Sequence, residues 1–169
     1  CSLVGSEMCI RDRSGVRQLV RHLLKQGRRR VAWFGPDFSA ATTFHYSARD
    51  RYAALGAELT AGGGALVLSS FARVGERLAG KAGELARRRD EFDVLVCYNF
   101  DYRDAVQWML IRQETSPLGF PVAHFASSWE ERGTYDFFDY VMLPEAELGR
   151  RGANFIPVSY THLTLPTIL

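Results

Sequence analysis

The chain has 169 residues, of which 47% are hydrophobic and 24% are charged, and its formal net charge is +2. This composition can build a hydrophobic core and so excludes a disordered chain, and the charge is not the strongly basic balance typical of a nucleic-acid-binding domain. No apolar run reaches the roughly 18 residues that a membrane-spanning helix needs.

The two ends of the chain resemble one piece of DNA translated in opposite senses. Residues 8–13 can be back-translated as ATG TGT ATA AGA GAC AG, and the reverse complement of that string encodes residues 158–162. Both flanks therefore resemble a translated transposon-end sequencing adapter, and such segments are excluded from fold reasoning. We expect adapter-like sequence at 1–13 and 157–169, and between them an insert, 14–156, that is an internal fragment of a longer protein.

The first element of the insert is predicted to be an amphipathic helix. Apolar residues recur there with helical spacing, at Val16, Leu19, Val20, Leu23 and Leu24. Gly27 follows them, and glycine is common directly after the last turn of a helix. The sequence therefore predicts a helix that ends just before Gly27.

Short apolar segments alternate with helical segments along the rest of the insert. The predicted strands are 31–34, 65–68, 93–97 and 120–125, with a fifth candidate at 140–143. The further predicted helices are 45–61, 74–86, 101–114 and one that starts near 144 and runs to 153. Because the strands are short and nearly all apolar, the pattern predicts an α/β fold with a doubly wound parallel sheet.

Polar and aromatic residues follow the predicted strands, at the edge of the sheet where such folds bind ligands. They are Asp37, Phe38, Ser39, Ser69, Ser70, Tyr98, Asn99, Phe100, Asp101, Ser127, Ser128 and Trp129. Planar polar groups can bond vicinal hydroxyls and flat rings can cover apolar sugar faces, so the set is typical of a sugar or polyol pocket. Ordinary turn chemistry, which also enriches loops in Ser, Asn and Asp, is the alternative.

The insert lacks the patterns of catalytic and metal sites. Its histidines, His22, His45 and His124, have no metal-ligand spacing, and Cys97 lies within an apolar strand, where a buried inert thiol is expected. No nucleophile elbow, phosphate loop or dinucleotide fingerprint is present. The sequence therefore predicts no enzymatic activity, no metal and no cofactor.

The predicted helix 101–114 is apolar around more than one face. Its apolar residues are Val106, Trp108, Met109, Leu110 and Ile111. A helix of this kind usually buries its second face against something. That face either packs inside a large core or, with Trp108, forms a contact between subunits of a homodimer.

Three segments of the insert, in order, resemble LacI/GalR-type transcriptional regulators. Residues 15–36 resemble the crossover helix and following strand of that family, 92–99 resemble the strand that the family ends in an Asn-Asp pair, and 147–153 resemble its Leu-Gly-Arg-Arg-Ala helix. The resemblance implies a periplasmic-binding-protein-like type I lobe, so 14–156 would be part of the effector-binding sensor.

The resemblance also implies a function for the whole protein. A missing N-terminal helix-turn-helix would bind DNA, the bacterial parent protein would be a cytoplasmic homodimer, and a small, sugar-like molecule would be its effector. A periplasmic sugar-binding protein of a transport system is the alternative, because it shares this lobe architecture. A flavodoxin-like module is a weaker match, since no phosphate-binding loop follows the first strand.

Site residues are carried over from the family one position at a time. Asn99 would hydrogen-bond the effector, and Arg49 would be the arginine at the start of the second helix, although Arg51 matches nearly as well. For either arginine, a solvated charge on the helix surface is the alternative. The loop after the first strand would add Asp37, Phe38 and Ser39.

The chain departs from the family at two effector-binding positions. Phe100 follows Asn99 where the family has Asp, so Asp101 comes one place late. Ser127 and Ser128 stand where the family has a carboxylate, and a hydroxyl cannot make the bidentate, charge-assisted bonds that a carboxylate makes. Asp101 and Ser127 are therefore predicted to belong to the site, but the identity of the effector does not carry over.

Overall fold

The structure is a computed structural model and describes residues 3–38, 46–73, 76–112, 121–126 and 139–142. Along the chain lie α1 (Leu3–Lys25), β1 (Arg30–Pro36), α2 (Tyr46–Ala61), β2 (Ala65–Ala72), α3 (Leu78–Arg87), the 3-10 turn η1 (Arg89–Glu91), β3 (Val94–Cys97), α4 (Phe100–Arg112), β4 (Val122–Ala126) and β5 (Asp139–Met142). The predicted alternation of strands and helices is confirmed, including the fifth strand.

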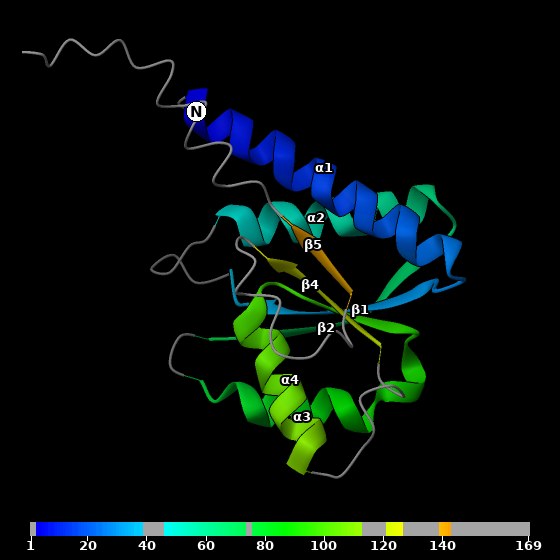
Figure 1. The fold of residues 1–169 in the computed structure, drawn as a ribbon, viewed down its shortest axis with the longest axis vertical. Helices are drawn as coiled ribbons and strands as arrows, with labels where there is room; N and C mark the ends of the chain where they lie inside the picture. The colour runs from blue at the N-terminus through cyan, green and yellow to red at the C-terminus, as the bar shows by residue number, and fades with distance from the viewer. Residues whose placement is uncertain (1–2, 39–45, 74–75, 113–120, 127–138, 143–169) are drawn as a thin grey trace, which may run out of the picture.

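The five strands form one sheet in the order β2-β1-β3-β4-β5, and every neighbouring pair is parallel. Helices α1 and α2 cover one face of this sheet, and α3 and α4 cover the other (Figure 1). The predicted doubly wound parallel sheet is therefore confirmed. In this arrangement the carboxyl ends of all five strands lie at one edge, where the loops that could bind a ligand begin.

Each face of the sheet has its own hydrophobic core. Ala32 and Phe34 of β1 pack toward α3 and α4, whereas Val31 and Trp33 pack toward α1 and α2. This alternation follows from the two-residue period of a strand. All four residues are fully buried because both faces of β1 are covered.

Several element boundaries differ from the sequence predictions. Helix α1 begins at Leu3 instead of near Val16, so it runs through the boundary between 13 and 14 without a break. Strand β2 continues to Ala72 and includes Ser69 and Ser70, which were predicted to follow the strand. Helix α3 begins at Leu78, four residues later than predicted. The predicted helix 144–153 lies outside the described residues.

Gly27 ends α1 as predicted. Its φ angle of 79° is in the left-handed region, which glycine adopts without the steric cost of a Cβ atom. In the part of the chain that the structure describes, each helix is too short or too polar to cross a membrane.

Candidate functional site at the carboxyl edge of the sheet

A buried arginine of α2 lies near the carboxyl ends of β3 and β4. The guanidinium of Arg51 is 5.0 Å from the ring centres of both Tyr98 and Phe125. Only 9% of its side chain is exposed. Planar guanidinium groups stack on aromatic rings in this way, and the two rings replace part of the water that the charge loses on burial.

The charge of Arg51 is balanced by Asp12 of α1. Arg51 donates from Nε to Asp12 Oδ1 at 3.1 Å and from Nη1 to the Tyr98 carbonyl at 3.2 Å. Burial raises the pKa of Asp12, and the neighbouring Arg51 partly offsets this effect. The ion pair therefore connects α1, α2 and the end of β3.

Two hydroxyl contacts join α2 to the neighbouring strands. The Tyr98 hydroxyl and Ser47 Oγ are 2.8 Å apart, and the Tyr52 hydroxyl and Ser69 Oγ are 3.0 Å apart. Each pair consists of groups that can both donate and accept, as a sugar hydroxyl does. All four residues are half-buried, so their polar groups lie at the boundary between the core and the edge of the sheet.

Three aromatic rings pack beside these hydroxyls. Phe38, Tyr52 and Phe71 have ring centres 5.1 to 5.5 Å apart in tilted or edge-to-face contacts. Phe38 follows β1 and Phe71 lies near the end of β2, so the cluster joins two strand ends to α2. Such a group of rings can stabilise the edge by itself and can also cover an apolar ligand face.

Asn99 and Asp101 lie together at the start of α4. Asn99 donates from Nδ2 to Asp101 Oδ2 at 3.1 Å, and its main-chain carbonyl accepts from the Arg103 amide at 3.3 Å. The side-chain oxygen of Asn99 is buried and has no hydrogen-bond partner among the described residues. Asp101, one place later than in the family pattern, therefore still contacts the asparagine that it follows.

The remaining predicted site residues are Asp37, Arg49, Ser39 and Ser127. Asp37 pairs with Arg73 at 3.5 Å between Oδ2 and Nε, which ties the loop after β1 to the segment after β2. Arg49 is about half exposed, and its Nε lies 3.8 Å from Asp50 Oδ1. Ser39 and Ser127 lie outside the described residues. The structure thus brings together Asn99 with Asp101, and Phe38 with the aromatic cluster.

Of the two arginines that the family resemblance leaves open, Arg51 is the buried one and Arg49 is about half exposed. The buried positions of α2 are Ala48, Arg51, Leu55 and Leu59, which follow helical spacing. Arg51 lies on that buried stripe and Arg49 does not. The same periodicity is readable in the sequence and places Arg51 on the buried side of the helix.

A second buried polar group lies on the opposite face of the sheet. Arg103 is 3% exposed, donates from Nε to Asp104 Oδ1 at 2.7 Å, and has Nη1 3.4 Å from His124 Nε2. Cys97 is buried beside it, and burial raises the pKa of its thiol well above the ordinary range, so the inert thiol predicted from the sequence fits this environment. Among the described residues, no group of His, Cys, Asp and Glu side chains is arranged to hold a metal ion.

Several solved structures with a similar fold are described as transcriptional regulators. A LacI-family regulator from Silicibacter pomeroyi aligns with a TM-score of 0.70 and 21% identity over 86% of this chain and 44% of its own. The trehalose repressor of Escherichia coli aligns with a TM-score of 0.65 and 19% identity, over 85% of this chain and 53% of its own. A periplasmic binding ribose operon repressor from Lactobacillus acidophilus aligns with a TM-score of 0.54 and 16% identity, over 68% and 40%.

These alignments show the fold that the sequence resemblance predicted. The chain spans about half the length of the solved structures it matches. No protein-family model and no curated protein matches the sequence.

Proposed function

We propose that this chain is part of a LacI/GalR-like transcriptional regulator and that the carboxyl edge of its sheet helps to bind a small, sugar-like effector. The fold of the regulators described above supports the first part. The second part rests on Arg51, a buried charge held between two rings at the edge where doubly wound sheets bind ligands.

The energetic cost of Arg51 supports a role beyond packing. Burying a guanidinium costs several kcal/mol unless rings, hydrogen bonds and an opposite charge compensate it. In this chain the Tyr98 carbonyl and the rings of Tyr98 and Phe125 compensate part of this cost. The opposite charge comes from Asp12, which lies in the adapter-like segment 1–13. In the proposed site Arg51 positions Tyr98, while the hydroxyls of Tyr98 and Tyr52 and the amide of Asn99 contact the effector.

The proposed mechanism couples effector binding to DNA binding. The effector closes the cleft between this lobe and a second one, and closure changes the spacing of two DNA-binding domains across a homodimer. DNA contact then belongs to a helix-turn-helix outside this chain. In this proposal the protein acts in the cytoplasm and binds its effector without transforming it.

Calorimetry on the parent protein tests the site, with trehalose and ribose as the first probes because two of the similar structures are repressors named for them. Asn99→Ala should abolish the binding heat and leave the melting temperature nearly unchanged. Gln18→Ala, which removes an exposed amide on α1, is the matched control and should bind normally. Equal affinity of Asn99→Ala and wild type would remove Asn99 from the site.

Sequencing across both ends of the insert in the source DNA distinguishes a transcriptional regulator from a periplasmic sugar-binding protein. An upstream reading frame that begins with a helix-turn-helix supports the regulator. A reading frame that begins with a signal peptide makes the parent a periplasmic sugar-binding protein instead. In that case only the calorimetry tests the proposed site.

A further inference from the structure

Trp33 of β1 carries a buried polar atom that has no hydrogen-bond partner. Its side chain is fully buried, and its indole Nε1 bonds to nothing in the part of the chain that the structure describes. An indole N–H can only donate, and a buried donor without an acceptor costs free energy, so a buried tryptophan usually finds a partner. An unsatisfied donor of this kind needs an explanation, and a ligand or a bound water that supplies the acceptor provides one.

The N–H edge of the indole faces the carboxyl end of β1. A Cβ atom at Gly35, two residues further along the strand, would lie 2.7 Å from Nε1. Residues two apart on a strand lie on the same face of the sheet, so Gly35 is one step nearer than Trp33 to the edge where the proposed effector binds. Because glycine has no side chain, nothing from position 35 covers Nε1 on that side.

Trp33 lies beneath the two tyrosines of the proposed effector site. Its ring contacts the rings of Tyr52 and Tyr98 edge-on, with ring centres 5.7 and 6.5 Å away. Both tyrosines are half-buried, so they extend from Trp33 toward the surface. Their hydroxyls lie against Ser69 and Ser47 and do not bond to the indole.

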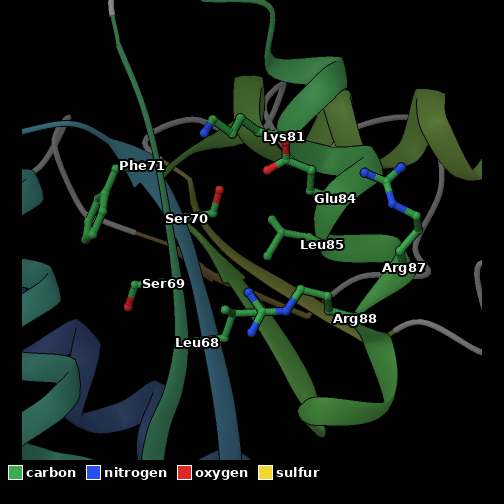
Figure 2. Close-up of a pocket in the computed structure, with 9 residues that line it drawn as sticks. All are labelled: Leu68, Ser69, Ser70, Phe71, Lys81, Glu84, Leu85, Arg87 and Arg88. Atoms are coloured by element: carbon green, nitrogen blue, oxygen red, sulfur yellow. The ribbon is translucent and has the colours of Figure 1, made fainter.

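The residues of β2 around Tyr52 belong to the same face of the sheet. In Figure 2, which shows the groove between β2 and α3, Ser69 and Phe71 project from β2 to the side away from α3, whereas Ser70 projects toward it. Ser69 contacts the Tyr52 hydroxyl, and Phe71 packs against the Tyr52 ring. Strands β1 and β2 therefore place Trp33, Ser69 and Phe71 on one face, around a tyrosine of α2.

A second unsatisfied atom adjoins the same site. Asn99 follows Tyr98 directly in the chain, and its buried Oδ1 has no hydrogen-bond partner among the described residues. The two atoms are complementary, because Trp33 offers a donor, Asn99 offers an acceptor, and neither is charged. A hydroxyl group can satisfy either atom, since it both donates and accepts. A ligand with several hydroxyl groups therefore fits the pair, whereas a simple anion or cation fits only one of the two atoms.

We propose that Trp33 is a specificity-determining residue of the effector site and that its indole N–H donates to a hydroxyl oxygen of a neutral, polyhydroxylated effector. This inference rests on the proposed function. The effector hydroxyl enters between the rings of Tyr52 and Tyr98 and accepts from Nε1 beside Gly35. A second hydroxyl of the effector donates to Asn99. A ligand without the first hydroxyl leaves the buried indole unsatisfied and binds more weakly, which is how such a donor selects its ligand.

Nuclear magnetic resonance of the isotope-labelled parent protein observes this hydrogen bond directly. The indole N–H resonance of Trp33 is the one that disappears in Trp33→Phe. Titration with trehalose and with ribose should move this proton resonance downfield for the sugar that binds, and should leave the resonance of Trp108, on α4 at the other face of the sheet, unchanged. A Trp33 resonance that stays in place while the sugar binds overturns the proposal, because the acceptor is then a bound water or nothing.

Calorimetry with the same two sugars measures what the donor contributes. Trp33→Phe keeps an aromatic ring and removes the N–H, so it should weaken binding by about tenfold, and Trp108→Phe is the matched control that should bind as wild type does. Equal affinity of Trp33→Phe and wild type overturns this inference and leaves the proposed function standing, provided that Asn99→Ala abolishes binding. If wild type binds neither sugar, the proposed sugar site fails and this inference fails with it. The resonance titration uses wild-type protein, so it decides the proposal even where Trp33→Phe loses stability.

Discussion

Asp93 joins the starts of β1 and β3. Its Oδ2 accepts from the backbone amides of Arg29 and Arg30, both at 2.8 Å, and its Oδ1 lies 2.8 Å from Arg30 Nη2. Burial by itself would raise the pKa of Asp93, but these hydrogen bonds and the Arg30 charge outweigh it and lower the pKa. The ionised carboxylate therefore stabilises the fold.

The sign of that shift predicts how Asp93→Asn behaves with pH. A carboxylate whose pKa is lowered in the folded state stabilises the protein at pH values above its unfolded-state pKa of about 4. This contribution is lost as the pH falls through the folded-state pKa. Asp93→Asn should cost about 2 kcal/mol at pH 7 and progressively less below about pH 4. Urea unfolding at several pH values measures this, and Asp90→Asn, whose side chain is 96% exposed, is the control. A cost that does not change with pH would contradict the assigned role.

Gly35 is required by the ring of Trp33. A Cβ atom at position 35 would lie 2.7 Å from Trp33 Nε1, and the indole is fully buried with little room to move. Gly35→Ala should therefore destabilise the protein by about 1 to 3 kcal/mol. Gly56→Ala in α2 is the matched control, because its Cβ meets nothing within 4 Å and alanine favours a helix by about 0.5 to 1 kcal/mol. Thermal unfolding distinguishes them, and equal melting temperatures would contradict the predicted clash.

At the scale of elements, α1 contains both adapter-like residues and residues of the insert. The adapter-like sequence is predicted to end at residue 13, yet α1 is continuous from Leu3 to Lys25 and Asp12 is buried against Arg51. A residue of any origin can contribute to the stability of the folded chain once it lies on the buried side of a helix. Residues 1–13 therefore contribute to the stability of this chain at least through Asp12.

Two truncations test this distinction. Removing residues 1–11 keeps the Asp12–Arg51 pair and should lower the melting temperature only slightly. Removing 1–13 leaves a buried guanidinium without its carboxylate and should cost about 3 kcal/mol more. Asp12→Ala in the full chain should reproduce the larger loss, whereas Arg13→Ala, at an exposed position, should not. Equal stability of both truncations would mean that solvent or another group replaces Asp12.

At the scale of the whole molecule, α4 leaves apolar surface uncovered. Trp108 is 67% exposed and Ile111 is 53% exposed, so these two residues do not pack within the core of this chain, which was one of the two alternatives. The alternative, a contact between subunits of the parent protein, stays a prediction.

Trp108→Asp tests that alternative. It should change the free energy of unfolding of this chain by no more than about 0.5 kcal/mol, because the side chain makes few buried contacts. In the parent protein it should shift sedimentation from dimer toward monomer. An unchanged dimer would remove Trp108 from the interface.

The sequence by itself determined the order and type of the elements and the class of the fold. Hydrophobic periodicity reports which side of a strand or helix is buried, and glycine marks where helices end, so α1 to α4 and all five strands were predictable in kind. Boundaries were less predictable: Ser69 and Ser70 resemble turn residues, but pairing with β1 holds them in the strand.

Only the tertiary structure decided which polar residues meet. Asp12 and Arg51 are far apart in sequence and come together because α1 and α2 pack side by side on one face of the sheet. Helical spacing predicts that Arg51 is buried, but it does not predict the position of Arg51 between Tyr98 and Phe125. The position of β2 at the end of the described sheet likewise depends on strand order, which arises from packing between distant segments and has no local signal.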